Sequence, residues 1–420
     1  MEKNNRRVEL YKLILSSLCI STLSAFMVYA LVLFTENFEH ILFHLAKKIN
    51  FLFFIFPFVG LSLIFFLRIY LFKKRENKGI KEIYDSLRTR HNELKFYKIP
   101  SHFLNGFLTV IFGGSTGIEV STVVASASVG SVLHENQKIH ERFRKELICV
   151  GVAAGVTALF GSPIAGLLFA FEVILKRISK VAFGLILLSV SFVWILNQVL
   201  NIKPIFHLDV SHWNHNVFPY FILLGVLAGL NSVYLTKCVL FFKAQFARLN
   251  SHFIRVFLAT LIIGFGILFF PALYGDGYHA IKEVLKNLNT LNFSYSLILG
   301  FLGLLLIKPI LSAITLSAGG DGGVFAPSLF IGAFLGLFLA FILNHYFDAH
   351  VIPVNFMLIG MAAVLSASLH APFTSVFLVC GIVGNFTLII PILVACLVSK
   401  LTAKMLFPYT VYTFHTKLQK

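Results

Sequence analysis

Two acidic residues lie inside long apolar stretches, where a charged side chain is costly and is usually functional. Glu119 lies in the glycine-rich run FGGSTGIEVS (112–121), and Glu172 lies in LLFAFEVIL (167–175). A carboxylate at a helix start can simply cap the helix at a membrane surface. It can also occupy an anion-binding site that is formed by the free N–H groups of the helix start. Glu119 therefore has two interpretations, a capping residue or a movable acid. Glu172 is either a second functional acid or a hydrogen-bonded structural carboxyl.

A second glycine-rich run, SAGGDGGVFAPS, covers residues 317–328. Glycine lets the backbone approach an ion closely, and the N–H groups at a helix start carry partial positive charge. Such groups would bind a small anion less tightly than lysine side chains and would release it faster. In this run the N–H groups would come from Val324, Phe325 and Ala326.

The two glycine-rich runs belong to an internal repeat. GIEVSTVVASASVG (117–130) matches GVFAPSLFIGAFLG (323–336), and GVAAGVTALFGSP (151–163) matches GMAAVLSASLHAP (360–372). The offsets, 206 and 209 residues, are nearly equal. We predict two homologous halves, about 50–200 and 216–407, within a single transmembrane domain over 1–420. Sequence alone does not separate a parallel from an inverted pair, and we expect an inverted one with its site at the interface of the halves.

The register of the repeat makes the halves unequal at two positions. Phe325 falls opposite Glu119, and His370 falls opposite Gly161. The acid is thus confined to the first half, and we expect His370 to be structural. Asp321 is the one acidic residue beside the glycine-rich run of the second half.

Composition places most of the chain in lipid. Hydrophobic residues make up 58% and charged residues 13% of the 420 residues, whereas soluble domains carry about 25% charged residues. We predict spanning helices at 11–35 and 50–72, separated by a polar loop over 36–49. Further apolar stretches cover 146–174, 180–200, 216–242, 252–273, 294–317, 322–344, 352–382 and 385–407. The expected fold class is an all-α integral membrane protein with broken and tilted helices.

The basic residues indicate topology. The net charge is +17, and residues 73–98 alone hold nine Lys and Arg. The positive-inside rule places this stretch and the N-terminus in the cytoplasm of a cell-membrane protein, and contact with anionic lipid explains the excess better than nucleic acid does. Within the stretch, IKEIYDSL is expected to form a short amphipathic helix. The five cysteines form no CxxC pair and are expected to be reduced packing residues.

At this point the motifs resemble a known family. Gly323-Val324-Phe325-Ala326-Pro327 is the G-x-F-x-P motif of the CLC family, and Gly117-Ile118-Glu119-Val120-Ser121 keeps the glycine and glutamate of its G-[K/R]-E-G-P motif. VASASVGSVL, AAGVTALFGSPIAGLLFAFEV and Lys308 are similar too. From about residue 50 the chain resembles CLC chloride channels and chloride–proton antiporters of the prokaryotic type, without C-terminal CBS domains.

The resemblance implies an anion site and its gate. Glu119 would act as gate and proton carrier. The family's GSGIP motif falls at Asn77–Lys81, so Lys78 replaces a serine that contacts the inner anion. The inner tyrosine would be Tyr412, with Tyr409 as the alternative. The implied anion-binding residues are Lys78, Gly79, Ile80, Gly117, Ile118, Gly323, Val324, Phe325, Ala326 and Tyr412.

The resemblance also sets expectations for coupling and assembly. Val173 occupies the place of the internal proton-accepting glutamate, which favours a passive or weakly proton-coupled chloride pathway. A strict chloride/proton antiporter and a fluoride exporter stay open. A homodimer with one pathway per subunit is implied, and neither a cofactor nor a metal is expected.

Two other classes fit the sequence less well. An intramembrane enzyme is disfavoured because HExxH, GxSxG and Walker motifs are missing from the sequence. A cation transporter would need acidic residues near the midplane in both halves, and the second half offers only Asp321.

Overall fold

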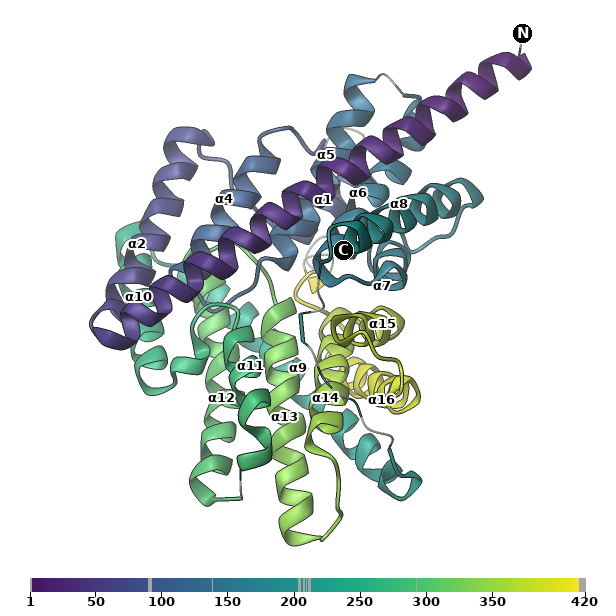
Figure 1. The fold of residues 1–420 in the computed structure, drawn as a ribbon. Helices are drawn as coiled ribbons and strands as arrows, with labels where there is room; N and C mark the ends of the chain where they lie inside the picture. Colours follow the sequence, from purple (N-terminus) through teal and green to yellow (C-terminus); the bar gives the residue numbers. More distant parts are fainter. Residues whose placement is uncertain are drawn as a thin grey trace.

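The computed structural model describes residues 2–89, 93–137, 139–202, 205–206, 208, 210, 213–291 and 293–414, with side chains from residue 8 onward. These residues contain sixteen α-helices and no β-strand beyond one isolated bridge. Eight helices are long and apolar enough to cross a membrane, so the predicted all-α membrane fold is confirmed (Figure 1). Arg90, His91 and Asn92 of the basic stretch lie outside the described residues.

The helix α1 (Glu2–Lys48) precedes the two predicted halves. The helices of the first half are α2 (Leu52–Phe66), α3 (Ile80–Arg88), α4 (Lys98–Ile111), α5 (Glu119–Asn136), α6 (Arg144–Phe160), α7 (Pro163–Leu168) and α8 (Lys180–Val199). Those of the second half are α9 (Phe218–Ala247), α10 (His252–Phe269), α11 (Tyr278–Asn287), α12 (Tyr295–Ser317), α13 (Phe325–Tyr346), α14 (Pro353–Leu369), α15 (Pro372–Val383) and α16 (Ile389–Leu406). The short helix expected at IKEIYDSL is α3.

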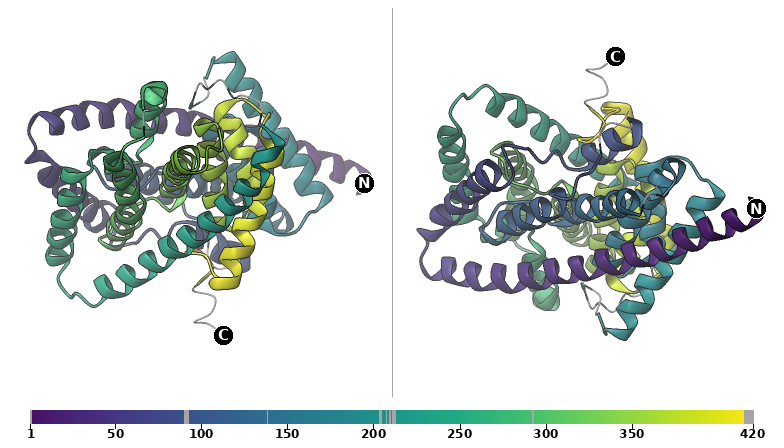
Figure 2. Two further views of the ribbon diagram at one scale, coloured as in Figure 1. Left: turned by 90° about the horizontal axis from the view of Figure 1, so that it is seen from below. Right: turned by 90° about the horizontal axis from the view of Figure 1, so that it is seen from above.

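The prediction of a polar loop at 36–49 is wrong, because α1 continues as one helix to Lys48. Figure 2 shows this long helix lying along one edge of the molecule. Thr35, Glu39 and Phe43 are buried at intervals of four residues, so they form one helical face that packs on the rest of the fold. The Phe43 ring lies 5.1 Å from the Tyr274 ring and 4.3 Å from the His279 ring. Tertiary packing thus holds a polar-looking segment in the helix.

Two of the predicted apolar stretches are broken at equivalent places. The stretch 146–174 divides into α6 and α7 at Gly161, and 352–382 divides into α14 and α15 at His370. Both residues adopt the left-handed conformation, with φ of 68° and 57°. A proline follows two positions later and begins the next helix, as is common after such a cap. The two breaks therefore have the same local backbone geometry, and His370 ends α14 as Gly161 ends α6.

Each half contains a helix pair that packs through glycine. In the second half, a Cβ at Gly360 of α14 would lie 2.2 Å from the Gly332 carbonyl oxygen of α13. In the first half, a Cβ at Gly151 of α6 would lie 2.1 Å from the Ser126 carbonyl oxygen of α5. Small residues let membrane helices approach closely where lipid provides no hydrophobic drive. The pairs α5–α6 and α13–α14 are therefore the packed centre of each half (Figure 1).

Gly360→Ala tests this packing. The added methyl group would meet backbone atoms that cannot move aside, and overpacking of this kind costs roughly 1–3 kcal/mol. We expect a lower thermal midpoint, measured by size-exclusion chromatography of heated, detergent-solubilised protein. Gly300→Ala in α12 is the matched control, because its Cβ would meet nothing within 4 Å. Equal midpoints for the two variants would contradict the packing argument.

Candidate functional site

The two halves meet where α5 and α13 begin. Gly117 and Gly323, equivalent in the repeat, form an antiparallel bridge. Antiparallel pairing of equivalent residues is what a local two-fold axis between the halves produces. A Cβ at Gly117 would lie 2.1 Å from Glu119 Oε2 and 2.5 Å from Ala326 Cβ, so this contact requires glycine. The glycines bring two helix starts, and hence two sets of backbone N–H groups, to one point.

Glu119 is the first residue of α5, and 1% of it is exposed. Its Oε1 accepts a hydrogen bond of 2.7 Å from the Tyr278 hydroxyl. Its Oε2 is buried without a hydrogen-bond partner of ordinary geometry in the described residues. The same Gly117 position shows that Glu119 Oε2 lies next to Ala326, in the first turn of α13. The acid of the first half therefore lies against the helix start of the second half.

No cation lies within 4 Å of the Glu119 carboxylate among the described side chains, whereas Glu82 lies 2.9 Å from the ammonium of Lys98. Tyr278, the hydrogen-bond partner of Glu119, was not among the residues expected from the sequence motifs. It begins α11 after the turn Gly275-Asp276-Gly277. The Tyr278 N–H donates to Asp276 Oδ1 over 2.8 Å. A tyrosine next to a glycine turn carries no pattern that identifies it as a contact of Glu119, so only the fold reveals this residue.

Lys308 lies beyond Tyr278 and is fully buried in α12. Its Nζ donates to the carbonyl oxygens of Gly275 and Asp276 at 3.1 and 3.3 Å and lies over the Phe330 ring. The buried carboxylates of Glu39 and Asp276 interact electrostatically with it. We name Glu39, Asp276 and Lys308 the outer cluster. A lysine inside the apolar stretch 294–317 was a sequence signal for such a site.

A cavity of about 290 Å³ opens on the other side of the bridge, the side that carries the basic stretch 73–98. Its wall combines both halves and the C-terminal segment. It includes Asn77, Lys78, Gly79, Lys81, Lys243, Asp321, Gly322, Gly323, Val324 and Tyr412. We name it the basic-side cavity. The structure thus brings together Lys78, Gly79, Gly323, Val324 and Tyr412, all of which were expected at one site.

The remaining expected residues lie near this cavity without lining it. Ile80 begins α3 and is buried, while Ile118 precedes α5 and is buried. Phe325 begins α13 and packs against Phe160 and Phe169, with ring centroids 6.1 and 5.7 Å away. Its ring is therefore part of the core, and only its backbone N–H could face an anion.

From its sequence position, Lys78 is either a lysine of the basic loop that reaches water or a cation at the inner anion entrance. Its backbone N–H donates to Glu82, so this group is already paired, while its side chain is exposed at the cavity. Gly79, with φ of 62°, makes the turn that begins α3. The charged side chain of Lys78, and not its N–H group, is thus available to an anion in the cavity.

Tyr412, and not Tyr409, lies on the cavity wall. The Tyr412 hydroxyl accepts a hydrogen bond of 3.3 Å from the Val324 N–H. A Cβ at Gly323 would lie 2.8 Å from this hydroxyl and 2.2 Å from Val120 Cγ2, so the cavity narrows here. Tyr409 instead packs against Phe407 and Phe414.

Glu172 is hydrogen-bonded to the start of α15. Its Oε2 accepts hydrogen bonds of 2.8 and 2.7 Å from the N–H and hydroxyl of Thr374, in the first turn of α15. The neighbouring Val173 is buried, and its carbonyl oxygen accepts a hydrogen bond of 2.9 Å from the Tyr84 hydroxyl. Glu172 therefore fixes the start of α15 and does not line the basic-side cavity. In the described part of the chain, no three metal-ligating side chains converge.

Solved structures share this fold. A slow cyanobacterial Cl⁻/H⁺ antiporter superposes with a TM-score of 0.82 at 22% identity, over 97% of this chain and 98% of that one. A CLC-type fluoride/proton antiporter superposes with a TM-score of 0.79 at 23% identity, over 96% and 97%. These likenesses establish the architecture.

Relatives in sequence identify the family. The voltage-gated ClC-type chloride channel ClcB of Shigella flexneri is 28% identical over 323 residues, 74% of each chain. ClcB of Escherichia coli (strain K12 / DH10B) is 27% identical over the same length. The family model described as voltage gated chloride channel matches residues 58–404, and the chain therefore belongs to the voltage-gated chloride channel (CLC) family.

Proposed function

We propose that this protein moves chloride, or a related small anion, between the helix starts of α3, α5 and α13, and that Glu119 gates the path. The single observation that carries the proposal is the position of the Glu119 carboxylate, which lies beside Ala326 at the start of α13. An acid there occupies the place that an anion would take. When the acid takes up a proton, its attraction to the N–H groups falls, and the place becomes free for the anion.

The electrostatics of the neighbourhood support a movable acid. Glu119 has a neutral hydroxyl as its side-chain partner, whereas Glu82 faces the ammonium of Lys98. A buried acid without a cation is costly in its charged form. Displacement by chloride keeps one negative charge at the same helix starts, so the exchange is electrostatically balanced.

We further propose that proton coupling is weak or absent. Val173 stands where an internal proton-accepting glutamate would be, and Glu172 beside it is held by Thr374. A strict chloride/proton antiporter is the alternative. A fluoride exporter is the other alternative within the same class, motivated by the altered motif at Asn77 and Lys78.

Orientation and assembly complete the proposal. Residues 73–98 would face the cytoplasm of the cell membrane, and two copies would form a homodimer. Labelling of single cysteines introduced at Lys74, in intact and permeabilised cells, tests the orientation. Light scattering of the purified particle tests the dimer, and a monomeric mass would contradict it.

Anion flux from proteoliposomes, recorded together with a pH electrode, tests the proposed gate. We expect chloride efflux from the wild type that depends on pH. In Glu119→Gln the acid is uncharged at every pH, so efflux should persist, lose its pH dependence and carry no proton movement. Glu172→Gln is the buried-acid control and should retain the wild-type pH dependence.

Each other outcome of the flux experiment has a defined meaning. Stoichiometric proton counterflow in the wild type that Glu119→Gln stops would establish the antiporter. Faster efflux of fluoride than of chloride would establish the fluoride exporter. No efflux with any halide gradient, from protein that elutes as a folded particle, would refute anion transport.

Tyr278→Phe tests what holds the acid in place. The variant removes the hydroxyl that donates to Glu119 and leaves the ring. A hydrogen bond to a charged group contributes about 1.5–3 kcal/mol, so chloride flux at pH 7 should rise roughly tenfold. Tyr274→Phe is the control, because its buried hydroxyl donates to the Ile111 carbonyl oxygen instead. An unchanged flux in Tyr278→Phe would mean that the tyrosine does not restrain the acid.

Lys78→Met tests the cation at the basic-side cavity. Loss of one positive charge at the cavity should raise the chloride concentration for half-maximal flux by a factor of about three to ten, and high salt should reduce the difference. Lys74→Met, in the same loop but away from the cavity wall, should leave that concentration unchanged. If both variants behave alike, Lys78 acts only through the overall charge of the loop.

A further inference from the structure

Two acids, Glu76 and Asp321, line the basic-side cavity, which is unexpected beside an anion path. Glu76 is exposed and lies 3.7 Å from the Arg68 guanidinium. Asp321 lines the cavity from the turn that precedes α13 and is 6% exposed. Its Oδ1 accepts a hydrogen bond of 2.9 Å from the Gly322 N–H. A negative charge at this position would repel an anion that enters the cavity. The carboxylate therefore needs a compensating positive charge close by.

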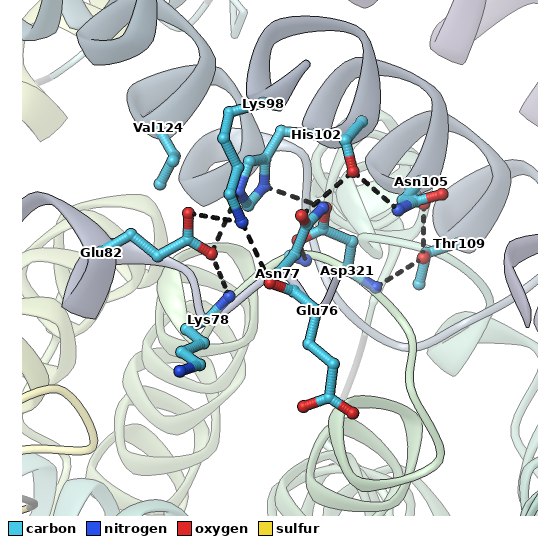
Figure 3. Close-up of polar contacts among 12 residues, drawn as sticks. Glu76, Asn77, Lys78, Glu82, Lys98, His102, Asn105, Thr109, Val124 and Asp321 are labelled. Atoms are coloured by element: carbon cyan, nitrogen blue, oxygen red, sulfur yellow. Dashed lines mark hydrogen bonds and ion pairs between the residues drawn. The ribbon is translucent and has the colours of Figure 1, made fainter. Parts of the chain in front are cut away.

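His102 of α4 provides that charge from behind the wall. Its side chain is fully buried, and its Nδ1 lies 2.9 Å from Asp321 Oδ2. The other ring nitrogen, Nε2, lies 3.8 Å from Glu82 Oε1. Figure 3 shows the imidazole between these two carboxylates, one from each half of the protein. Neutral imidazole has one N–H donor, so a ring that faces two carboxylates is best satisfied as imidazolium.

The charges of the group cancel only if His102 is protonated. Glu82 also lies 2.9 Å from the ammonium of Lys98. Burial by itself would raise the pKa of the Glu82 carboxyl, but the neighbouring His102 and Lys98 lower that pKa to about 2. Two carboxylates, Glu82 and Asp321, thus face two cations, Lys98 and His102. Loss of the His102 proton would leave one net negative charge behind the cavity wall.

Hydrogen bonds extend this group across the interface of the halves. Asn77 Nδ2 donates to Asp321 Oδ2 over 2.6 Å, and Asn77 Oδ1 accepts from the Ser101 hydroxyl over 3.0 Å. The Asp321 N–H donates to the Thr109 hydroxyl over 2.9 Å. These bonds join the loop before α3 and the helix α4 to the turn before α13 (Figure 3). The positions of two anion-facing turns therefore depend on one buried polar network.

We propose that His102 is a positioning residue for the basic-side cavity: its imidazolium cancels the charge of Asp321 and holds the turn before α13 against the start of α3. This inference rests on the proposed anion transport. It assigns chloride affinity in the cavity to a residue that does not touch the anion, and it makes that affinity depend on pH through a group other than Glu119.

His102→Gln tests the proposal, with chloride affinity measured by titration calorimetry and flux measured in proteoliposomes. Glutamine keeps a polar side chain but loses the charge, so the dissociation constant for chloride should rise about tenfold at pH 7. In the wild type the affinity should fall as the pH rises and the imidazolium loses its proton, and His102→Gln should flatten this dependence. The ring faces Glu82 and Asp321, with Lys98 and Asn77 next to them. Glu76, Lys78, Lys81 and Lys243 line the cavity in both proteins, so the comparison isolates the contribution of His102.

A second substitution separates charge from structure. Asp321→Asn should tighten chloride binding severalfold, and the double variant His102→Gln with Asp321→Asn should return the constant to near the wild-type value. His134→Gln is the matched control, because His134 is buried in α5 and forms no ion pair in the described part of the chain. It should leave the chloride affinity unchanged.

The outcomes separate the role of His102 from the anion transport on which it rests. If His102→Gln does not fold, Asp321→Asn alone decides, and a weaker or unchanged affinity in that variant overturns the role of His102. A folded His102→Gln with wild-type affinity and pH dependence also overturns it, while wild-type flux leaves the anion transport itself intact. Absent flux in the wild type would instead refute the transport on which the inference rests.

Discussion

A small anion can rest inside a membrane protein only if polar groups replace its water without holding it permanently. In the path proposed for this protein, backbone N–H groups at helix starts would supply that field, and the starts of α5 and α13 reach one point because Gly117 and Gly323 pair directly. A side chain at either glycine would push the helix starts apart. The starts of α5 and α13 can meet only if the helices are broken inside the fold. The glycine-packed helix pairs and the burial of both halves serve the same contact.

Around this point the buried ionisable groups form two sets in which acids and cations lie close together. On one side the outer cluster sets Lys308 against Glu39 and Asp276. On the other, Lys98 and His102 face Glu82 and Asp321. Such sets are costly to break, because removal of one partner leaves a charge in a low-dielectric interior. Glu119 lies between them with only a hydroxyl as its side-chain partner, which makes it the acid that is least costly to move.

The two halves share a backbone plan and differ in the side chains that carry the proposed chemistry. Gly161 and His370 end equivalent helices in the same left-handed conformation. Glu119 and Phe325 begin equivalent helices, but one is an acid at the interface and the other is a core aromatic ring. A symmetric scaffold thus presents an asymmetric site. An anion that approaches from either side meets a different set of groups.

Sequence alone determined the membrane class, the repeat and the residues of the glycine-rich motifs, because apolar length, Gly-x-Ala-Ala spacing and motif order are local properties. It also located Glu119, since an acid in an apolar run is conspicuous. Other features depend on which segments the fold brings together. The helix at 36–48 exists because Thr35, Glu39 and Phe43 pack on the core, and Glu172 is hydrogen-bonded because Thr374 of the other half reaches it. Tyr278 and His102 lie in unremarkable local sequence and gain their importance from carboxylates distant in the chain, so only the tertiary structure could reveal them.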